Sequence, residues 1–392
     1  MTPAARASAA ISVLDGWLGG LAAEQALSRW SRGARYAGSG DRAAVRDLVF
    51  DVLRHMESAA QAGGAADGRG LVLGLLRLRG SDPASLFDGV GYGPEPLTEA
   101  ETAFAERPLR PPEPGTDIPP WLREAIGLRA EDAAARDTLF AALCERAPVW
   151  LRVVLRRTTR DAAQARLDAE GIATRPDPGC DTALLVTGGA RSLRGSAAYR
   201  DGLVELQDLS AQRAVASVPW PSRGRILDFC AGGGGKALAI TDRTGAAVLA
   251  HDASERRMSD LPARAARAGV TIERLASGQA AARAPYEAVL CDVPCSGTGT
   301  WRRDPEAKWR LAPERLDELR QLQAHILDEA APLVAEGGLL VYMTCSLLAC
   351  EDEEQVAAFL RRAPGWRQEG ARLDTPLSAS DGFYTAILRR TA

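Results

Sequence analysis

The sequence of 392 residues lacks several features that would place it in a specialised class. It contains no apolar run long enough to cross a lipid bilayer as a helix. Its start has an early Arg6 but no uninterrupted apolar core and no cleavage site, which favours a mature N-terminus over a signal peptide. We find no internal repeat and no low-complexity tract. The length favours two or three folded domains.

Cysteine and histidine are both scarce. The seven cysteines are scattered and include no CxxC pair, which excludes a disulfide scaffold and favours a reducing, cytoplasmic setting. Only three histidines occur, at positions 55, 251 and 325, so we expect no zinc site and no other metal site. Together with the missing apolar run, these counts favour a role without membrane contact and without a bound metal.

The chain also lacks a strong excess of positive charge. Its net charge is −3, so binding to nucleic acid would require a local basic surface. Two stretches are candidates for it: "WLRVVLRRTTR" at 150–160 and "WRRDPEAKWR" at 301–310. By charge alone, the simpler interpretation is that both are solvated faces of ordinary elements.

The N-terminal part is rich in helical patterns. Within 39–58, apolar residues recur at i, i+3, i+4 and i+7, which predicts a helix with one buried face that ends at the glycine pair 63–64. Shorter helical patterns lie at about 4–18, 21–31 and 70–79. Six prolines fall within 106–120, so this stretch is neither a continuous helix nor a central strand, and it reads as a connector.

The pattern changes after residue 131. A small unit follows in which helices alternate with short β-branched strands. From 225 onward, apolar strands alternate with helices, which predicts a parallel sheet covered on both faces, with ligands at the carboxyl ends of the strands. The predicted strands are 225–230, 246–252, 271–276, 286–292 and 338–346, and the predicted helices are 236–242, 254–268, 313–335 and 351–362.

A glycine-rich turn follows the first of these strands. In "ILDFCAGGGGKALAI", Gly232 to Gly235 allow a tight turn and a close approach of ligand to backbone, and a helix begins behind them. The spacing matches neither GxGxxG nor a Walker loop. Asp252 lies at the end of the next strand, where a carboxylate typically binds ribose hydroxyls. The combination favours an adenosine-containing cofactor, and the alternative is a structural turn with a solvated aspartate.

Two cysteines, Cys295 and Cys345, stand just beyond neighbouring predicted strands. Free cysteine is usually a small buried hydrophobe, and we interpret the other five in that way. Cys295 and Cys345 are flanked by Thr, Ser and Gly near helix N-termini, a setting that lowers the pKa of a thiol. A thiolate that adds to carbon 6 of a pyrimidine makes carbon 5 nucleophilic, so that it can take a methyl group. The base must then be unstacked into the site.

These motifs resemble a known family. "LDFCAGGGGK", "DVPCSGTGTWRRDPEAKW" and "TCS" are similar to the motifs of Sun-type RNA cytosine-5 methyltransferases, and the resemblance covers about 150–392. The segment "GDRAAVRDLVFDVLRH" resembles the NusB-like N-terminal domain of the ribosomal-RNA branch. The resemblance implies an α/β fold with a Rossmann-like methyltransferase sheet (215–392), a small α/β, RRM-like RNA-binding subdomain (128–214) and an all-α, NusB-like RNA-binding domain (1–127).

The resemblance also implies roles for individual residues. Cys345 would be the nucleophile, Cys295 would help to release the methylated base, Asp292 would hydrogen-bond the cytosine, and Lys236 would lie near the catalytic edge. The expected cofactor is S-adenosylmethionine and the expected partner is RNA, most simply ribosomal RNA, bound by a monomer. The residues expected to bind the cofactor are Cys230, Ala231, Gly232, Gly233, Gly234, Gly235, Lys236, Asp252, Arg257, Ser277 and Asp292.

The sequence departs from the family pattern at four places. Gly232 and Gly233 replace an Ala-Pro pair, Ser277 stands where relatives have an Asp near the adenine, Val154 replaces an Asn, and Ala349 replaces a Pro. Three other functions stay open at this point: a transfer-RNA cytosine-5 methyltransferase, a DNA cytosine-5 methyltransferase with the Pro-Cys thiol as nucleophile, and a non-catalytic RNA-binding ribosome assembly factor.

Overall fold

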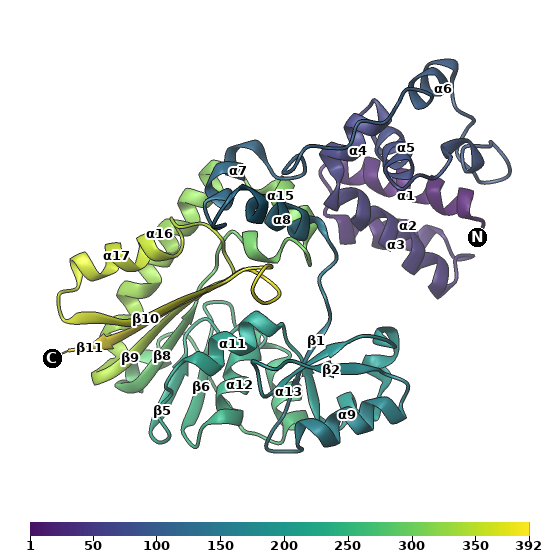
Figure 1. The fold of residues 1–392 in the computed structure, drawn as a ribbon. Helices are drawn as coiled ribbons and strands as arrows, with labels where there is room; N and C mark the ends of the chain where they lie inside the picture. Colours follow the sequence, from purple (N-terminus) through teal and green to yellow (C-terminus); the bar gives the residue numbers. More distant parts are fainter. Residues whose placement is uncertain (392) are drawn as a thin grey trace. The chain divides into compact units, whose positions relative to one another are not determined.

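The computed structural model describes residues 1–391, which fall into two compact units (Figure 1). Unit 1 consists of residues 1–145 together with the separate segment 301–310. Unit 2 consists of the remaining described residues. The units thus differ from the expected boundaries, because 128–145 and 301–310 both group with the N-terminal helices. The division into three domains stays a prediction. No helix over the described range is long and apolar enough to cross a membrane.

Unit 1 is built from helices whose apolar faces share one core. The core gathers side chains such as Leu14, Val49, Leu53 and Leu73, which are fully buried. The helices are α1 (Pro3–Leu18), α2 (Ala23–Gly33), α3 (Ser39–Arg54), α4 (Met56–Gly63), α5 (Gly68–Leu78), α6 (Glu99–Ala105), α7 (Pro120–Gly127), α8 (Ala133–Cys144) and α15 (Pro305–Arg310), with a short 3-10 turn at Pro83–Ser85. The all-helical prediction for this part is confirmed, and 106–119 contains no helix or strand, as its prolines predict.

The structure differs from the sequence prediction at one helix of unit 1. The pattern over 39–62 predicts a single helix, but the chain breaks at His55 and continues as α4. The cause lies in a distant residue: the buried carboxylate of Asp117 accepts hydrogen bonds from the backbone N–H of Ser58 at 3.0 Å and from its hydroxyl at 2.7 Å. This carboxylate caps the first turn of α4 and starts a new helix.

The segment 301–310 is packed into unit 1 and does not form the basic surface considered above. Trp301 is fully buried, and Lys308 is 1% exposed. The Lys308 ammonium donates to the backbone oxygen of Arg54 at 2.7 Å, and the indole N–H of Trp309 donates to the backbone oxygen of Leu53 at 2.7 Å. Trp301, Lys308 and Trp309 therefore fill structural positions, while Arg303 and Arg310 are exposed.

Unit 2 contains two sheets. The smaller has the order β2-β3-β1-β4 and is antiparallel throughout. Its elements are β1 (Trp150–Val153), β2 (Thr174–Pro176), β3 (Ala183–Val186), β4 (Val204–Leu206), α9 (Arg160–Ala169) and α10 (Ala197–Arg200), with a 3-10 turn at Ala190–Gly195. The second basic stretch, 150–160, begins here. Arg152 is buried against Asp242 at 3.2 Å, and Arg156 donates to the backbone oxygen of Thr244, so these guanidiniums are also used within the unit.

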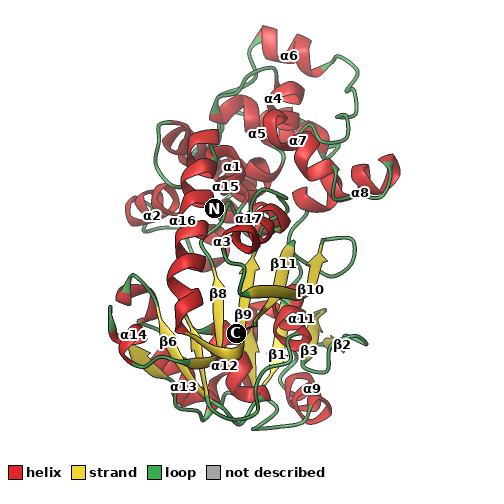
Figure 2. Cartoon of the chain, turned by 90° about the vertical axis from the view of Figure 1, so that its left-hand side faces the viewer, coloured by secondary structure: helices red, strands yellow, loops and turns green. Residues whose placement is uncertain are grey.

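The larger sheet has seven strands in the order β10-β11-β9-β8-β5-β6-β7. Figure 2 draws its strands, among them β8 and β9, in yellow and the helices in red. The predicted strands pair in parallel from β9 to β7, which confirms the α/β prediction, while β10 and β11 add an antiparallel edge that the parallel pattern did not predict. The strands are β5 (Arg225–Asp228), β6 (Ala247–His251), β7 (Glu273–Leu275), β8 (Tyr286–Asp292), β9 (Val334–Thr344), β10 (Trp366–Asp374) and β11 (Phe383–Arg390).

Helices cover both faces of this sheet. One apolar cluster includes side chains from α16 and α17 with Tyr342 of β9, and another includes side chains from α11 and α12 with Val341 of the same strand. Successive residues of a strand point to opposite faces, so the two clusters lie on opposite sides. The helices are α11 (Leu209–Ser217), α12 (Gly235–Arg243), α13 (Leu261–Ala268), α14 (Gln279–Ala282), α16 (Pro313–Ala330) and α17 (Glu353–Arg362).

Candidate active site

Four parallel strands of the large sheet end at one edge, and each carries a polar side chain there. β5 ends at Asp228, β6 is followed by Asp252, β8 ends at Asp292, and β9 is followed by Cys345. Because β8 pairs directly with β9, with Asp292 opposite Met343, the loops after these two strands begin side by side. This edge is where open α/β sheets bind ligands.

The two cysteines singled out in the sequence meet at this edge. The sulfur atoms of Cys295 and Cys345 are 3.3 Å apart, which is hydrogen-bonding distance and much longer than the roughly 2.05 Å of a disulfide. The hydrogen bond from Cys295 lowers the pKa of Cys345 below its usual value, against the effect of burial, and it raises the pKa of Cys295 well above its own. The geometry therefore favours Cys345 as the thiolate and Cys295 as its thiol donor.

A lysine and a carboxylate flank this pair. The Lys236 ammonium donates to Oδ2 of Asp292 at 2.5 Å and lies 4.9 Å from the centre of the Phe383 ring. Burial acts to lower the pKa of Lys236, but the charge and hydrogen bond of Asp292 outweigh it, so that the pKa is raised and the lysine stays protonated. Its charge also contributes to the lowered pKa of Cys345. The edge thus combines a thiol pair with a fixed cation and a carboxylate.

A buried glutamate joins the two cysteine loops. Oε1 of Glu351 accepts from the backbone N–H of Ser296 at 2.8 Å and from the amide of Gln323 at 2.9 Å. Oε2 accepts from the hydroxyl of Ser346 at 2.6 Å and from the hydroxyl of Ser296. Ser296 follows Cys295 and Ser346 follows Cys345, so one carboxylate fixes the residue after each cysteine.

The glycine loop has the backbone geometry that its sequence predicts. Gly232 and Gly234 have φ angles of 50° and 76°, in the left-handed region that glycine tolerates. A Cβ atom on Gly234 would lie 2.2 Å from a methyl group of Leu261, so no side chain fits there. On Gly232 the nearest atom to such a Cβ would be a guanidinium nitrogen of Arg257 at 3.7 Å, which leaves this turn open to a ligand.

Asp252 is turned into the glycine loop. One of its oxygens accepts from the backbone N–H of Gly232 at 2.9 Å, the other accepts from that of Ser254 at 2.9 Å, and Arg257 lies 3.4 Å away. In this arrangement Asp252 holds the loop, and a ribose hydroxyl would share its remaining lone pairs. Ser277 is exposed beyond the end of β7.

The remaining residues expected to bind a cofactor lie along the same loop. Cys230 and Ala231 join β5 to the glycines, and burial raises the pKa of the Cys230 thiol. The backbone oxygen of Gly233 accepts from Arg264, and that of Gly235 accepts from Gln207 at 3.3 Å. All the predicted cofactor residues are thus on or next to the loops that follow β5, β6, β7 and β8.

Sequence reasoning missed two buried carboxylates at this edge. Asp228 is fully buried with one oxygen that no donor within the described residues reaches, and burial, reinforced by the charge of Asp292, raises its pKa to about 7. A cationic or hydrogen-bonding group of a ligand would satisfy this oxygen, so the loop fits a cofactor such as S-adenosylmethionine, whose sulfonium is positive. The signal for Asp228 was its place at the end of the first strand. Glu351 was hidden within the acidic run "CEDEEQ".

Two models of known protein families match parts of this chain. Residues 220–388 match the model of 16S rRNA methyltransferase RsmB/F, and residues 118–191 match the model of the ferredoxin-like domain of RsmF/B-like methyltransferases. The second match begins before the predicted start of the small α/β subdomain at 128. Both matches agree with the family resemblance seen in the sequence.

The curated relatives of this chain share one name, ribosomal RNA small subunit methyltransferase B. The chain is 35% identical over 263 residues to ribosomal RNA small subunit methyltransferase B of Vibrio cholerae serotype O1, over 62% of this chain and 59% of that protein. It is 33% identical over 300 residues to the protein of this name from Xanthomonas campestris pv. campestris, over 70% of this chain and 67% of that protein. The alignment with the Vibrio protein therefore spans about three fifths of that protein's length.

Solved structures share the fold. The crystal structure of PH0851 matches with a TM-score of 0.76 at 20% identity and covers 100% of this chain and 99% of its own. The structure of NSun6 from Pyrococcus horikoshii with SFG matches with a TM-score of 0.61 at 17% identity, over 70% of this chain and 98% of its own. At these identities the similarity establishes the fold.

Proposed function

The chain belongs to the 16S rRNA methyltransferase RsmB/F family, and on this premise we propose that it transfers a methyl group from S-adenosylmethionine to carbon 5 of a cytosine in RNA. We propose small-subunit ribosomal RNA as the substrate, because the family model and the curated relatives are named for it. The observation that carries the chemistry is the 3.3 Å contact between Cys295 and Cys345 beside Lys236 and Asp292.

In the proposed cycle the Cys345 thiolate adds to carbon 6 of the cytosine. The new carbon–sulfur bond turns the ring into an enamine whose carbon 5 is nucleophilic. S-adenosylmethionine supplies the methyl group when it is bound. In our proposal the oxygen of Asp292 that does not accept from Lys236 hydrogen-bonds the base, and the Lys236 ammonium balances the charge at this edge.

Release of the product requires two bonds to break. The carbon 5 proton leaves to a water molecule of the solvent, and the electron pair that it leaves behind expels Cys345 as a thiolate, which restores the aromatic ring. In our proposal Cys295 assists this step, because its sulfur is in contact with the leaving sulfur and its thiol proton stabilises the thiolate that forms. The raised pKa of Cys295 suits a group that keeps its proton while Cys345 is ionised.

The proposal is tested by incubating the protein with tritiated S-adenosylmethionine and 16S rRNA, followed by nucleoside analysis. We expect 5-methylcytidine at a specific position, and bisulfite sequencing of RNA from cells that lack the protein should lose that signal. Methylation of transfer RNA instead of ribosomal RNA would support the alternative substrate, and binding of RNA without methyl transfer would support the non-catalytic assembly factor.

A further inference from the structure

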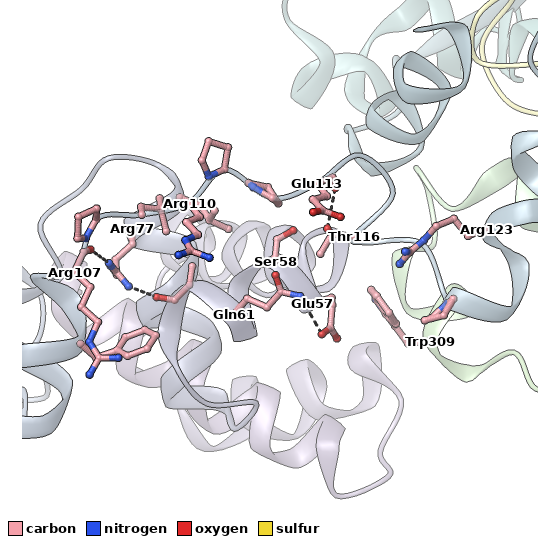
Figure 3. Close-up of a pocket in the computed structure, with 18 residues that line it drawn as sticks. Glu57, Ser58, Gln61, Arg77, Arg107, Arg110, Glu113, Thr116, Arg123 and Trp309 are labelled. Atoms are coloured by element: carbon pink, nitrogen blue, oxygen red, sulfur yellow. Dashed lines mark hydrogen bonds between the residues drawn. The ribbon is translucent and has the colours of Figure 1, made fainter. Parts of the chain in front are cut away.

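Unit 1 contains a cavity whose chemistry the proposed reaction does not use. It has a volume of about 650 Å³, which lies within the range of ligand-binding pockets. Its walls come from α4, the last turn of α5, the segment 107–116, the start of α7 and the end of α15, all within unit 1 (Figure 3). The proline-rich segment forms one side of the cavity.

Four arginines line this cavity: Arg77, Arg107, Arg110 and Arg123. Figure 3 shows their side chains spread along its length. Within residues 1–391 none of the four forms an ion pair with a carboxylate. Two glutamates, Glu57 and Glu113, also line the cavity, which leaves an excess of two positive charges. This excess stands out in a chain with a net charge of −3.

The contacts that these arginines do make leave their charge uncompensated. Arg77 donates to the backbone oxygens of Ala62 and Arg107, and Arg123 donates to that of Ile118 at 3.4 Å. The guanidiniums of Arg77 and Arg107 lie 5.3 and 5.4 Å from the centre of the Phe104 ring, which holds them in place. Carbonyl oxygens and a ring orient a guanidinium without neutralising it, so all four remain available to an anion.

In each of the two basic stretches that the sequence suggested for nucleic acid, one cation is withdrawn from solvent, although Arg156 and Arg157 of the first stretch are exposed and donate only to backbone oxygens. Arg152 and Lys308 are buried and bonded within their own units, as described above. The arginines of the cavity come from α5, the proline-rich segment and α7, so no single stretch of sequence reveals them.

We propose that this cavity binds consecutive phosphates of the RNA backbone, away from the nucleotide that is methylated. The proposal rests on the RNA substrate proposed above. Arginine is the side chain best matched to phosphate oxygens, and backbone contacts of this kind position an RNA without reading its sequence. The cavity would thus supply affinity and register, while the edge of the large sheet in unit 2 supplies the chemistry.

The test uses the full-length protein with Arg107→Gln and Arg110→Gln, singly and together. These two side chains are exposed, so their loss should leave folding and S-adenosylmethionine binding unchanged. Arg35→Gln is the matched control, because Arg35 is also exposed in unit 1 and lies outside the cavity. The probes are a 16S rRNA transcript and a single-stranded RNA oligonucleotide, with inorganic pyrophosphate as competitor, and affinity is measured over a range of salt concentrations.

We expect the double variant to bind both RNAs about tenfold more weakly, with the slope of log affinity against log salt reduced by about one to two, while Arg35→Gln matches the wild type. Equal affinity and slope in the double variant, or an equal loss in Arg35→Gln, would overturn the proposal. Tight pyrophosphate binding that RNA does not displace would do so as well, because it would identify a site for small anions.

The experiment distinguishes a failure of the cavity proposal from a failure of the proposed function. If the wild type methylates RNA and its affinity does not depend on the cavity arginines, the proposal for the cavity fails alone. If the wild type binds RNA through these arginines and transfers no methyl group, the proposed methyltransferase activity fails alone.

Discussion

Replacement of Glu351 by glutamine tests whether one buried carboxylate holds both cysteine loops. The wild-type carboxylate accepts four hydrogen bonds, two on each oxygen, and is fully buried. A glutamine keeps one acceptor oxygen, which can retain the donors that cannot reverse: the backbone N–H of Ser296 and the amide of Gln323. Its NH₂ group then faces the hydroxyls of Ser296 and Ser346, which can rotate to accept.

The size of the effect follows from the loss of charge in these bonds. A hydrogen bond to a charged group contributes roughly 1 kcal/mol more than a neutral one, so four of them set an upper limit of about 4 kcal/mol. Rotation of the two hydroxyls recovers part of this, and we expect Glu351→Gln to lower the free energy of unfolding by about 2–3 kcal/mol. The looser loops should also separate the two sulfurs and slow methyl transfer at saturating S-adenosylmethionine.

The assays are urea unfolding followed by circular dichroism and single-turnover methyl transfer. Glu354→Gln is the control, because Glu354 is an exposed carboxylate three residues further on, and we expect a change within about 0.5 kcal/mol. If Glu351→Gln matches this control in both stability and rate, the carboxylate does not organise the site. If stability falls while the rate stays normal, its role is confined to folding.

Three other predictions follow from the site and from unit 1. Lys236→Met removes a charge that lowers the pKa of Cys345, so the pKa of Cys345 should rise, and the pH profile of RNA adduct formation should shift to higher pH; an unchanged profile would exclude the lysine from thiol activation. Gly234→Ala forces a side chain onto Leu261 at a φ of 76°, and we expect a loss of stability of about 1–3 kcal/mol with weaker S-adenosylmethionine binding in calorimetry, whereas normal binding would mean that the loop rearranges freely. Limited proteolysis should cut first within 106–114, where every residue is exposed and none is in a helix or strand, and mass spectrometry showing earlier cuts elsewhere would contradict this.

The parts of the fold that depend on local pattern could be predicted from the sequence. Apolar strands alternating with helices predict the parallel sheet, and strand ends in a parallel sheet share one edge, so the meeting of Cys295 and Cys345 could be anticipated. The break of the N-terminal helix at His55 could not, because Asp117, which caps the new helix, is 59 residues from Ser58.

Features of the fold and site that depend on partners distant in the sequence could not be predicted. "WRRDPEAKWR" reads as a charged surface, yet Lys308 is buried because Arg54 and Cys144 supply acceptors for its ammonium. In the same way, Glu351 lies within an acidic run that is typical of the start of a helix, and its role is visible only once Ser296 lies beside Ser346. Composition cannot distinguish a buried, bonded charge from a solvated one.

The central claim is that Cys345 attacks the base and Cys295 releases it, and Cys295→Ala tests this most directly. The variant should still attack and methylate the RNA but release it slowly, so that incubation with 16S rRNA and S-adenosylmethionine gives a protein–RNA adduct that survives denaturing electrophoresis. Because the hydrogen bond from Cys295 lowers the pKa of Cys345, the reaction is run over a range of pH that extends above neutrality. Our account predicts an adduct in Cys295→Ala and none in Cys345→Ala or the double variant. An adduct in Cys345→Ala that is absent from Cys295→Ala would contradict it and assign the nucleophile to the Pro-Cys thiol.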